Sequence, residues 1–210
     1  MTNENATKVT ENKTGTVQSV NIRFMAVTAM LSAVAFILMF LDFSVPVAPS
    51  FLKMDISELP ALIAAFSMGP VSGVVVCLIK NLLHLTITST GGVGELCNFL
   101  LGVAFVVPAG FIYRVKKTKK GAIAGALIGT VIMGVFSIPL NYFLTYPVYY
   151  NFMSEEVILT LYQAIVPSMK SILQCLVCFN MPFTMVKGLL SVIITMLVYK
   201  PLSPIIKGRN

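Results

Sequence analysis

The chain has 210 residues, of which 57% are hydrophobic and only 11% are charged, and its mean hydropathy is +0.88. A soluble domain of this length needs more charge to cover its surface, so the composition predicts an integral membrane protein in a lipid bilayer. The net charge of +7 does not indicate nucleic-acid binding, because the basic residues form short clusters between apolar runs.

Residues 1–20 are polar, mixed in charge and free of aromatic residues, which is typical of a disordered tail. The apolar stretch that follows is long and has no small-residue cleavage site, so we expect an anchoring helix rather than a signal peptide. The rest of the chain, residues 21–210, should form one transmembrane domain.

Five apolar runs follow along the chain, and an apolar run of about 18 or more residues predicts a membrane span. They cover residues 24–41, 58–88, 93–113, 121–148 and 170–199. The second run is too long for one ordinary span. It contains Gly69–Pro70, where proline removes a backbone donor and disfavours helix in the preceding residue.

The positive-inside rule decides between five and six spans. Splitting the second run into helices over 58–69 and 70–88 puts the five basic residues of 114–120 in the cytoplasm. Both termini and eleven of the fifteen basic residues then lie in the cytoplasm as well. We therefore predict an all-α fold with six transmembrane helices. The short helix over 58–69 must be buried among its neighbours or lie beside a polar cavity.

Two longer segments lie on the outer side in this topology. Residues 42–57 are rich in proline and apolar residues, unlike a solvated loop. Residues 146–169 contain four tyrosines, Tyr146 among them, together with Glu155 and Glu156. The tyrosines are consistent with an aromatic belt at the membrane interface and equally with a lid over an outward-facing pocket.

Polar residues inside the predicted spans indicate a binding site. Lys187 lies in the middle of the last helix and needs an acceptor, which we expect to be a ligand; a structural pair with Glu95 or a helix carbonyl is the alternative. Asn141 offers a donor and an acceptor that suit an amide-like edge, or a hydrogen bond between helices. Glu95 and Asn98 lie one turn apart on one helix face. His84 has no partner ligands, so we expect no metal site.

Small residues mark two packing faces, Ala29 with Ala33 in the first helix and Gly121, Gly125 and Gly129 in the fifth. The chain has no phosphate-binding loop, nucleophile elbow or zinc motif. We therefore expect a protein that is not an enzyme, and any energy for transport must come from an ion gradient or another subunit.

Several motifs resemble those of the riboflavin-specific S components of energy-coupling factor (ECF) transporters. The resemblance covers about residues 24–199 in colinear order. Its motifs are Phe51-Leu-Lys-Met-Asp-Ile-Ser-Glu-Leu-Pro-Ala61, Gly69-Pro-Val-Ser-Gly73, Ile79-Lys-Asn-Leu-Leu-His84, Gly94-Glu-Leu-Cys-Asn-Phe99, Leu140-Asn-Tyr-Phe143 and Pro182-Phe183 with Lys187.

The resemblance implies a six-helix ECF S-component fold in a prokaryotic cell membrane, with a vitamin pocket near the outer face. Riboflavin is then the transported substrate rather than a cofactor. The partners are a transmembrane scaffold subunit and two ATPase subunits. Ala29 and Ala33 match an alanine motif through which the family couples to the scaffold.

The resemblance also assigns substrate-binding residues. Asn141 and Lys187 match family positions that hydrogen-bond the flavin ring. Thr184 stands where the family has asparagine, and Asn180 lies one turn away, where its amide compensates. The expected substrate-binding residues are Asn141, Lys187, Thr184, Asn98, Glu95, Lys53, Phe51 and Tyr146.

Three other functions remain as alternatives. They are an S component for a different vitamin, a stand-alone carrier of a small solute, and a membrane enzyme that uses Glu95, His84 or the cysteines. A carrier built from inverted repeats is disfavoured because no internal repeat is apparent. An enzyme would turn over its substrate without ATPase subunits.

Overall fold

The computed structural model describes residues 22–45, 49, 52–88 and 91–207. The expected disordered tail, residues 1–20, and the expected site residue Phe51 lie outside the described residues. The chain is helical almost throughout, which confirms the predicted all-α class. The helices are α1 (Ile22–Met39), α2 (Glu58–Met68), α3 (Pro70–His84), α4 (Val93–Val115), α5 (Lys119–Leu140), α6 (Tyr146–Tyr149), α7 (Glu155–Gln163), α8 (Ile172–Cys175) and α9 (Met181–Lys207).

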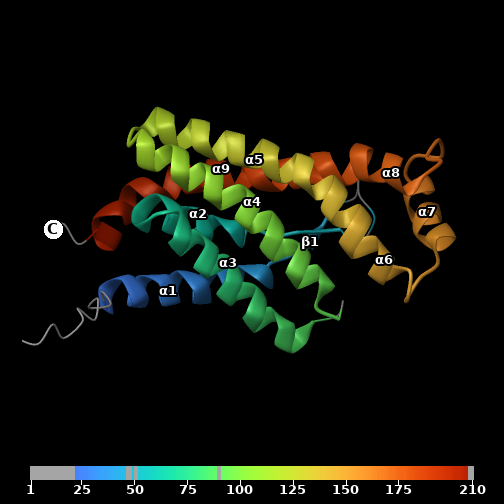
Figure 1. The fold of residues 1–210 in the computed structure, drawn as a ribbon, viewed down its shortest axis with the longest axis horizontal. Coiled ribbons are helices and arrows are strands. Elements are labelled where there is room, and N and C mark those ends of the chain that lie inside the picture. The colour runs from blue at the N-terminus through green and yellow to red at the C-terminus, as the bar shows by residue number, and fades with distance from the viewer. Residues whose placement is uncertain (1–21, 46–48, 50–51, 89–90, 208–210) are drawn as a thin grey trace, which may run out of the picture.

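Five helical stretches among the described residues are long and apolar enough to cross a membrane. Three of them are composite, because α3 continues into a 3-10 turn at Leu85–Ile87, α5 continues into α6, and α8 continues into α9. The shorter apolar helix α2 completes the six predicted helices. Figure 1 shows the first turn of α1, the turn between α4 and α5 and the end of α9 at one end of the bundle. We call this the basic end, because residues 114–120 carry five Lys and Arg.

The break predicted between the second and third helices is present. α2 ends at Met68, Gly69 has φ +106°, and Pro70 is the first residue of α3. A φ in this range strains a residue with a Cβ, and proline at the first helical position loses no hydrogen bond that the helix would otherwise make. The two residues therefore form a sharp reversal between two helices.

Helix α2 is too short to cross the membrane, and it is almost completely buried in the protein. Its nine residues from Glu58 to Phe66 are buried, and its apolar side chains form the centre of the main core with α3, α4, α5 and α9. An 11-residue helix spans about 16 Å, roughly half of the hydrocarbon core, so neighbouring protein must enclose it. The prediction that it is buried beside its neighbours is confirmed.

The glycine stripe of α5 is an internal packing face. A Cβ at Gly125 would lie 2.8 Å from the carbonyl oxygen of Ala109, and one at Gly129 would overlap the carbonyl of Phe105. The absence of side chains at these positions lets α5 lie directly on α4. The alanine stripe of α1 differs, because Ala29 and Ala33 are exposed on the outside of the described bundle.

Three features were not predicted, and all lie at the end opposite the basic end. Residues Phe43–Ser44 (β1) and Lys53–Met54 (β2) pair as a short antiparallel ladder, with Phe43 opposite Met54. The segment expected as an outer loop contains α7, which begins at the N-cap Ser154 and packs through Ile158. The third feature is π-helical backbone at Asn141–Thr145 and Leu176–Asn180.

Candidate functional site

A cavity of about 640 Å³ opens at the end opposite the basic end. It is lined by the segment between α1 and α2, the facing ends of α3 and α4, both π-helical segments, and α9. Its volume lies within the range of about 300–1,000 Å³ that is usual for small-molecule sites. Six expected site residues line it: Lys53, Glu95, Asn98, Asn141, Thr184 and Lys187.

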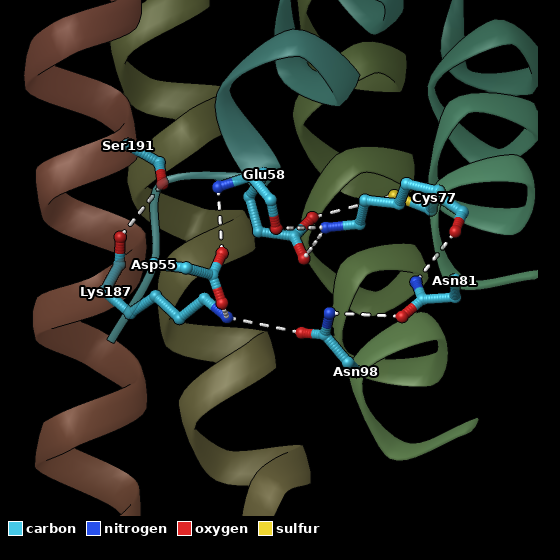
Figure 2. A network of polar contacts seen from close by, with 9 residues as sticks. Asp55, Glu58, Cys77, Asn81, Asn98, Lys187 and Ser191 are labelled. Carbon is cyan, nitrogen blue, oxygen red and sulfur yellow. Dashed lines mark hydrogen bonds and ion pairs between the residues drawn. The ribbon is translucent and has the colours of Figure 1, made fainter. Parts of the chain in front are cut away.

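Lys187 reaches into the cavity from α9 and is held by two acceptors. Its Nζ donates to Asp55 Oδ2 at 2.9 Å and to Asn98 Oδ1 at 3.2 Å (Figure 2). A lysine ammonium has three donors, so a third remains available after these two bonds. Lys187 therefore forms a structural ion pair, as the alternative prediction had it, but the carboxylate belongs to Asp55 and not to Glu95.

Asp55 is a site residue that we did not predict. Burial tends to raise the pKa of its carboxyl group, but the nearby ammonium groups of Lys187 and Lys80 lower it from 3.8 to about 2. Asp55 is therefore ionised at neutral pH. Its other oxygen, Oδ1, accepts the Ser57 backbone N–H at 2.8 Å, which fixes the segment just before α2. The available signal was a carboxylate within an apolar, proline-rich stretch.

A second ion pair is fully buried beneath the first. Lys80 Nζ of α3 lies 2.7 Å from Glu58 Oε1 and 2.8 Å from Ser57 Oγ. The side chains of Lys80 and Glu58 are 0% and 1% exposed. Glu58 is the first residue of α2, so the pair ties the start of this short helix to α3. Such a pair gives little net stability, but removing one partner leaves a costly buried charge.

Amide side chains extend the contacts of Lys187 from α9 to α3. Asn98 Nδ2 donates to Asn81 Oδ1 at 3.2 Å, and Asn81 Nδ2 donates to the Cys77 carbonyl at 2.7 Å. Figure 2 shows Asn98 between Lys187 and Asn81, so α9, α4 and α3 are linked in one chain of contacts. One Asn98 hydrogen remains beyond these bonds.

Asn141 lies on the first π-helical segment, where its amide retains unused hydrogen-bonding capacity. Nδ2 donates to the Ser137 carbonyl at 2.7 Å, and among the described residues Oδ1 receives only the weak Cys97 Sγ contact at 3.9 Å. One N–H and most of the carbonyl oxygen remain for a ligand. The buried residues Thr184 and Asn180 line the cavity one turn apart on the last helical stretch.

Both π-helical segments end just before an X–Pro pair. Tyr146 N–H bonds to the Asn141 carbonyl before Pro147, and Met181 N–H bonds to the Leu176 carbonyl before Pro182. Proline has no N–H for the carbonyl four residues earlier, and its ring crowds that carbonyl. Widening the helix relieves this conflict and is common at functional sites. Here it places Asn141 and Asn180 at the cavity wall.

Glu95 organises the turn between α3 and α4 at the cavity. Its Oε1 lies 2.8 Å from His84 Nδ1, and its Oε2 accepts Thr88 Oγ1 at 2.9 Å. Thr88 Oγ1 accepts the Gly92 N–H in turn. His84 is therefore a hydrogen-bonded residue beside the cavity, and among the described residues no group of three or more His, Cys, Asp or Glu could hold a metal.

Tyr146 is the one described residue of the expected set that does not line the cavity. It is 1% exposed, and its Oη shares a hydrogen bond of 2.5 Å with Tyr162 Oη. Tyr162 donates to Asn180 Oδ1 at 2.7 Å. These tyrosines join α6 and α7 to the second π-helical segment, while Tyr149 lines the cavity itself. They therefore form a packed wall, not a uniform aromatic belt.

Comparisons with known proteins agree with this architecture. The family "ECF transporter, substrate-specific component" matches residues 23–199. The riboflavin transporter RibU of Staphylococcus aureus is 36% identical over 179 residues, which cover 85% of this chain and 89% of that protein. The riboflavin transporter FmnP of Bacillus subtilis is 33% identical over 192 residues, which cover 90% and 96%.

A solved structure, described as "Structure and mechanism of the S component of a bacterial ECF transporter", has the same fold. It superposes with a TM-score of 0.72 at 33% identity and covers 90% of this chain and 99% of that chain. The family match spans more than four fifths of the chain. This chain therefore belongs to the substrate-specific S components of ECF transporters.

Proposed function

We propose that this protein captures riboflavin from the outer side of a bacterial membrane and passes it inward with a scaffold subunit and two ATPases. In this orientation the basic end and both termini are cytoplasmic, in keeping with the positive-inside rule. Riboflavin is the transported substrate, and we expect no chemical turnover of it.

The observation that carries the proposal is the placement of Asn141, Asn98 and Lys187 around one cavity. A flavin ring is large, planar and mostly apolar, with one edge of alternating carbonyl and N–H groups. The cavity offers apolar contact from side chains such as Leu101, Met133 and Phe183. Its polar side offers an amide donor and acceptor at Asn141 and the third ammonium donor of Lys187.

The relatives support riboflavin as the substrate. Two relatives at 33% identity or more, each aligned over at least 85% of this chain, are riboflavin transporters by name. Thr184 supplies a hydroxyl at the cavity wall, and Asn180 supplies an amide one turn away. The ion pair of Lys187 with Asp55 keeps the site close to neutral, which suits an uncharged ligand.

Flavin fluorescence tests the proposal directly. Purified protein should quench riboflavin fluorescence on titration, and denaturation should release the vitamin. Asn141→Ala and Lys187→Ala should each weaken binding about tenfold or more, because a hydrogen bond in a dry pocket is worth about 1.5–3 kcal/mol when one partner is charged and somewhat less when both are neutral. Leu127→Ala, on the outer face of α5, is the control and should bind as wild type.

The contrary result is equally clear. Absence of quenching by the folded wild type would exclude riboflavin as the ligand. Wild-type affinity in both cavity variants would show that the vitamin binds elsewhere.

A further inference from the structure

Charge is divided unequally between the two ends of the molecule. In the part of the chain that the structure describes, four carboxylates line the cavity and the other two begin α7. The basic end carries Arg114, Lys116, Lys117, Lys119 and Lys120. None of the four ion pairs among described residues involves these five cations. No carboxylate of the described bundle therefore pairs with these five cations.

A second cavity of about 490 Å³ lies at this basic end, between α4 and α5. Its walls are apolar and come from Phe111, Ile112, Ala124 and Ile128, among others. Lys116, Thr118 and Lys120 line its polar rim. We call it the basic-end groove.

The two helices that line the groove pack closely against each other. A Cβ at Gly121 would overlap the Lys116 carbonyl, and a Cβ at Gly125 would lie 3.1 Å from Ile112 Cβ. The α4–α5 turn is therefore fixed next to the groove, and Thr118 caps α5 by accepting the Gly121 N–H at 3.0 Å. Lys116 is the C-cap of α4 and Lys120 lies in the first turn of α5, so the two lysines stand on either side of this turn.

We propose that the basic-end groove binds one anionic diacyl phospholipid, with an acyl chain along its apolar wall and the phosphate between Lys116 and Lys120. Phe111 and Val115 are 61% and 72% exposed, so the wall faces the hydrocarbon side of the bilayer. Basic residues at the membrane surface attract anionic headgroups, and basic pockets between membrane helices bind them specifically. This site is separate from the flavin cavity and does not depend on the substrate proposed above.

The lysine rim is tested by two double variants with the same loss of charge. Lys116→Gln/Lys120→Gln removes both lysines that line the groove, whereas Lys117→Gln/Lys119→Gln removes two neighbours that do not. Purified full-length protein is mixed with dioleoyl phosphatidylglycerol or dioleoyl phosphatidylcholine, and retained lipid is counted by native mass spectrometry.

We expect wild type to retain one phosphatidylglycerol in preference to phosphatidylcholine. The groove variant should lose that preference by about tenfold or more, and the neighbour variant should change by less than about threefold. If the two variants lost this preference equally, general surface charge would explain the binding, and the proposed site would be wrong. Equal retention of the two lipids by wild type would overturn it as well.

The apolar wall is tested with Ala124→Phe, which fills the groove, against Leu127→Phe, which adds bulk on α5 outside it. Thermal unfolding confirms that each variant is folded, and Ala124→Leu replaces Ala124→Phe if the larger residue prevents folding. Only the groove-filling variant should lose the phosphatidylglycerol. Soluble glycerol phosphate should not displace the lipid; displacement at similar concentration, or lipid retention by a folded groove-filled variant, would contradict the proposal.

Discussion

At the scale of single residues, Lys187 shows how one charge can serve both the fold and the ligand. Two of its donors are bound to Asp55 and Asn98, and the third remains for a substrate carbonyl. The pair is almost buried, with both side chains 12% exposed. A lysine without the carboxylate would carry an unpaired charge in the membrane, and a carboxylate without the lysine would repel an electron-rich ring edge.

We expect Lys187→Met to lower stability strongly, by about 3 kcal/mol, because it leaves Asp55 ionised and unpaired. The double variant Asp55→Asn/Lys187→Met should regain at least half of that loss, yet neither variant should bind riboflavin well. Thermal unfolding in detergent measures the first effect and fluorescence titration the second. Lys53→Met removes an exposed pair with Asp42 and should cost less than about 1 kcal/mol. Additive effects of Asp55→Asn and Lys187→Met would mean that the pair is not coupled.

Thr184 is a second residue whose contribution can be separated. We expect Thr184→Val to weaken riboflavin binding only modestly, since one hydroxyl hydrogen bond contributes about 0.5–1.5 kcal/mol. Thr184→Asn should keep or tighten binding, because it adds an amide beside that of Asn180. The same titration measures both. Complete loss of binding in either variant would show that this turn contacts the ligand differently.

At the scale of elements, the helices were predictable and the irregular backbone was not. Six helices could be placed from the lengths of the apolar runs, the Gly69–Pro70 break and the positive-inside rule, because each of these signals can be read from the sequence without knowing the packing. The π-helical segments and the β1–β2 pairing depend on the balance of local strain against packing. Pro147 and Pro182 were the available signal, since each lies two residues after the end of one π-helical segment.

The candidate site was predictable to a similar extent. Placing a polar side chain inside the membrane costs free energy, and this alone singled out Lys187 and Asn141 by residue type. Partner identity was not predictable: Lys187 lies 132 residues from Asp55 along the chain, and nothing local in either stretch indicates the other. The same reason explains why the alternative partner that we considered for Lys187, Glu95, pairs with His84 instead.

The second π-helical segment yields a prediction at this scale. Pro182→Ala restores a backbone donor and removes the crowding of the carbonyl four residues earlier, so the helix can tighten to regular α form. Asn180 should then turn away from the cavity wall, and riboflavin affinity should fall several-fold without loss of thermal stability. Pro108→Ala, in the interior of α4, is the control and should leave affinity unchanged. Unaltered affinity in Pro182→Ala would show that the wider turn is not needed for the site.

At the scale of the whole molecule, the two small-residue stripes have different surroundings. The glycines of α5 face α4, where a side chain would overlap backbone. Ala29 and Ala33 face outward, while Ser32 and Ala35 of the same helix face the core. An outward stripe of methyl groups permits close approach of a further helix in the membrane. We therefore propose this face of α1 as the one that contacts the scaffold subunit.

Replacing these alanines separates docking from folding. We expect Ala29→Trp and Ala33→Trp to fold and to bind riboflavin as wild type does, but to abolish cellular uptake, because the bulky ring prevents close approach of the scaffold. Val34→Trp adds the same ring at an exposed position of α1 about 100° around the helix from Ala33, and it should retain uptake. Ala35→Trp is the opposite control: its side chain is 0% exposed, so overpacking should cost about 1–3 kcal/mol and reduce stability and binding together. Binding by the purified variants is compared with uptake by cells that express them. If Ala29→Trp and Ala33→Trp behaved like Ala35→Trp and lost binding together with uptake, the stripe would be part of the internal packing and the scaffold would have to dock on another face.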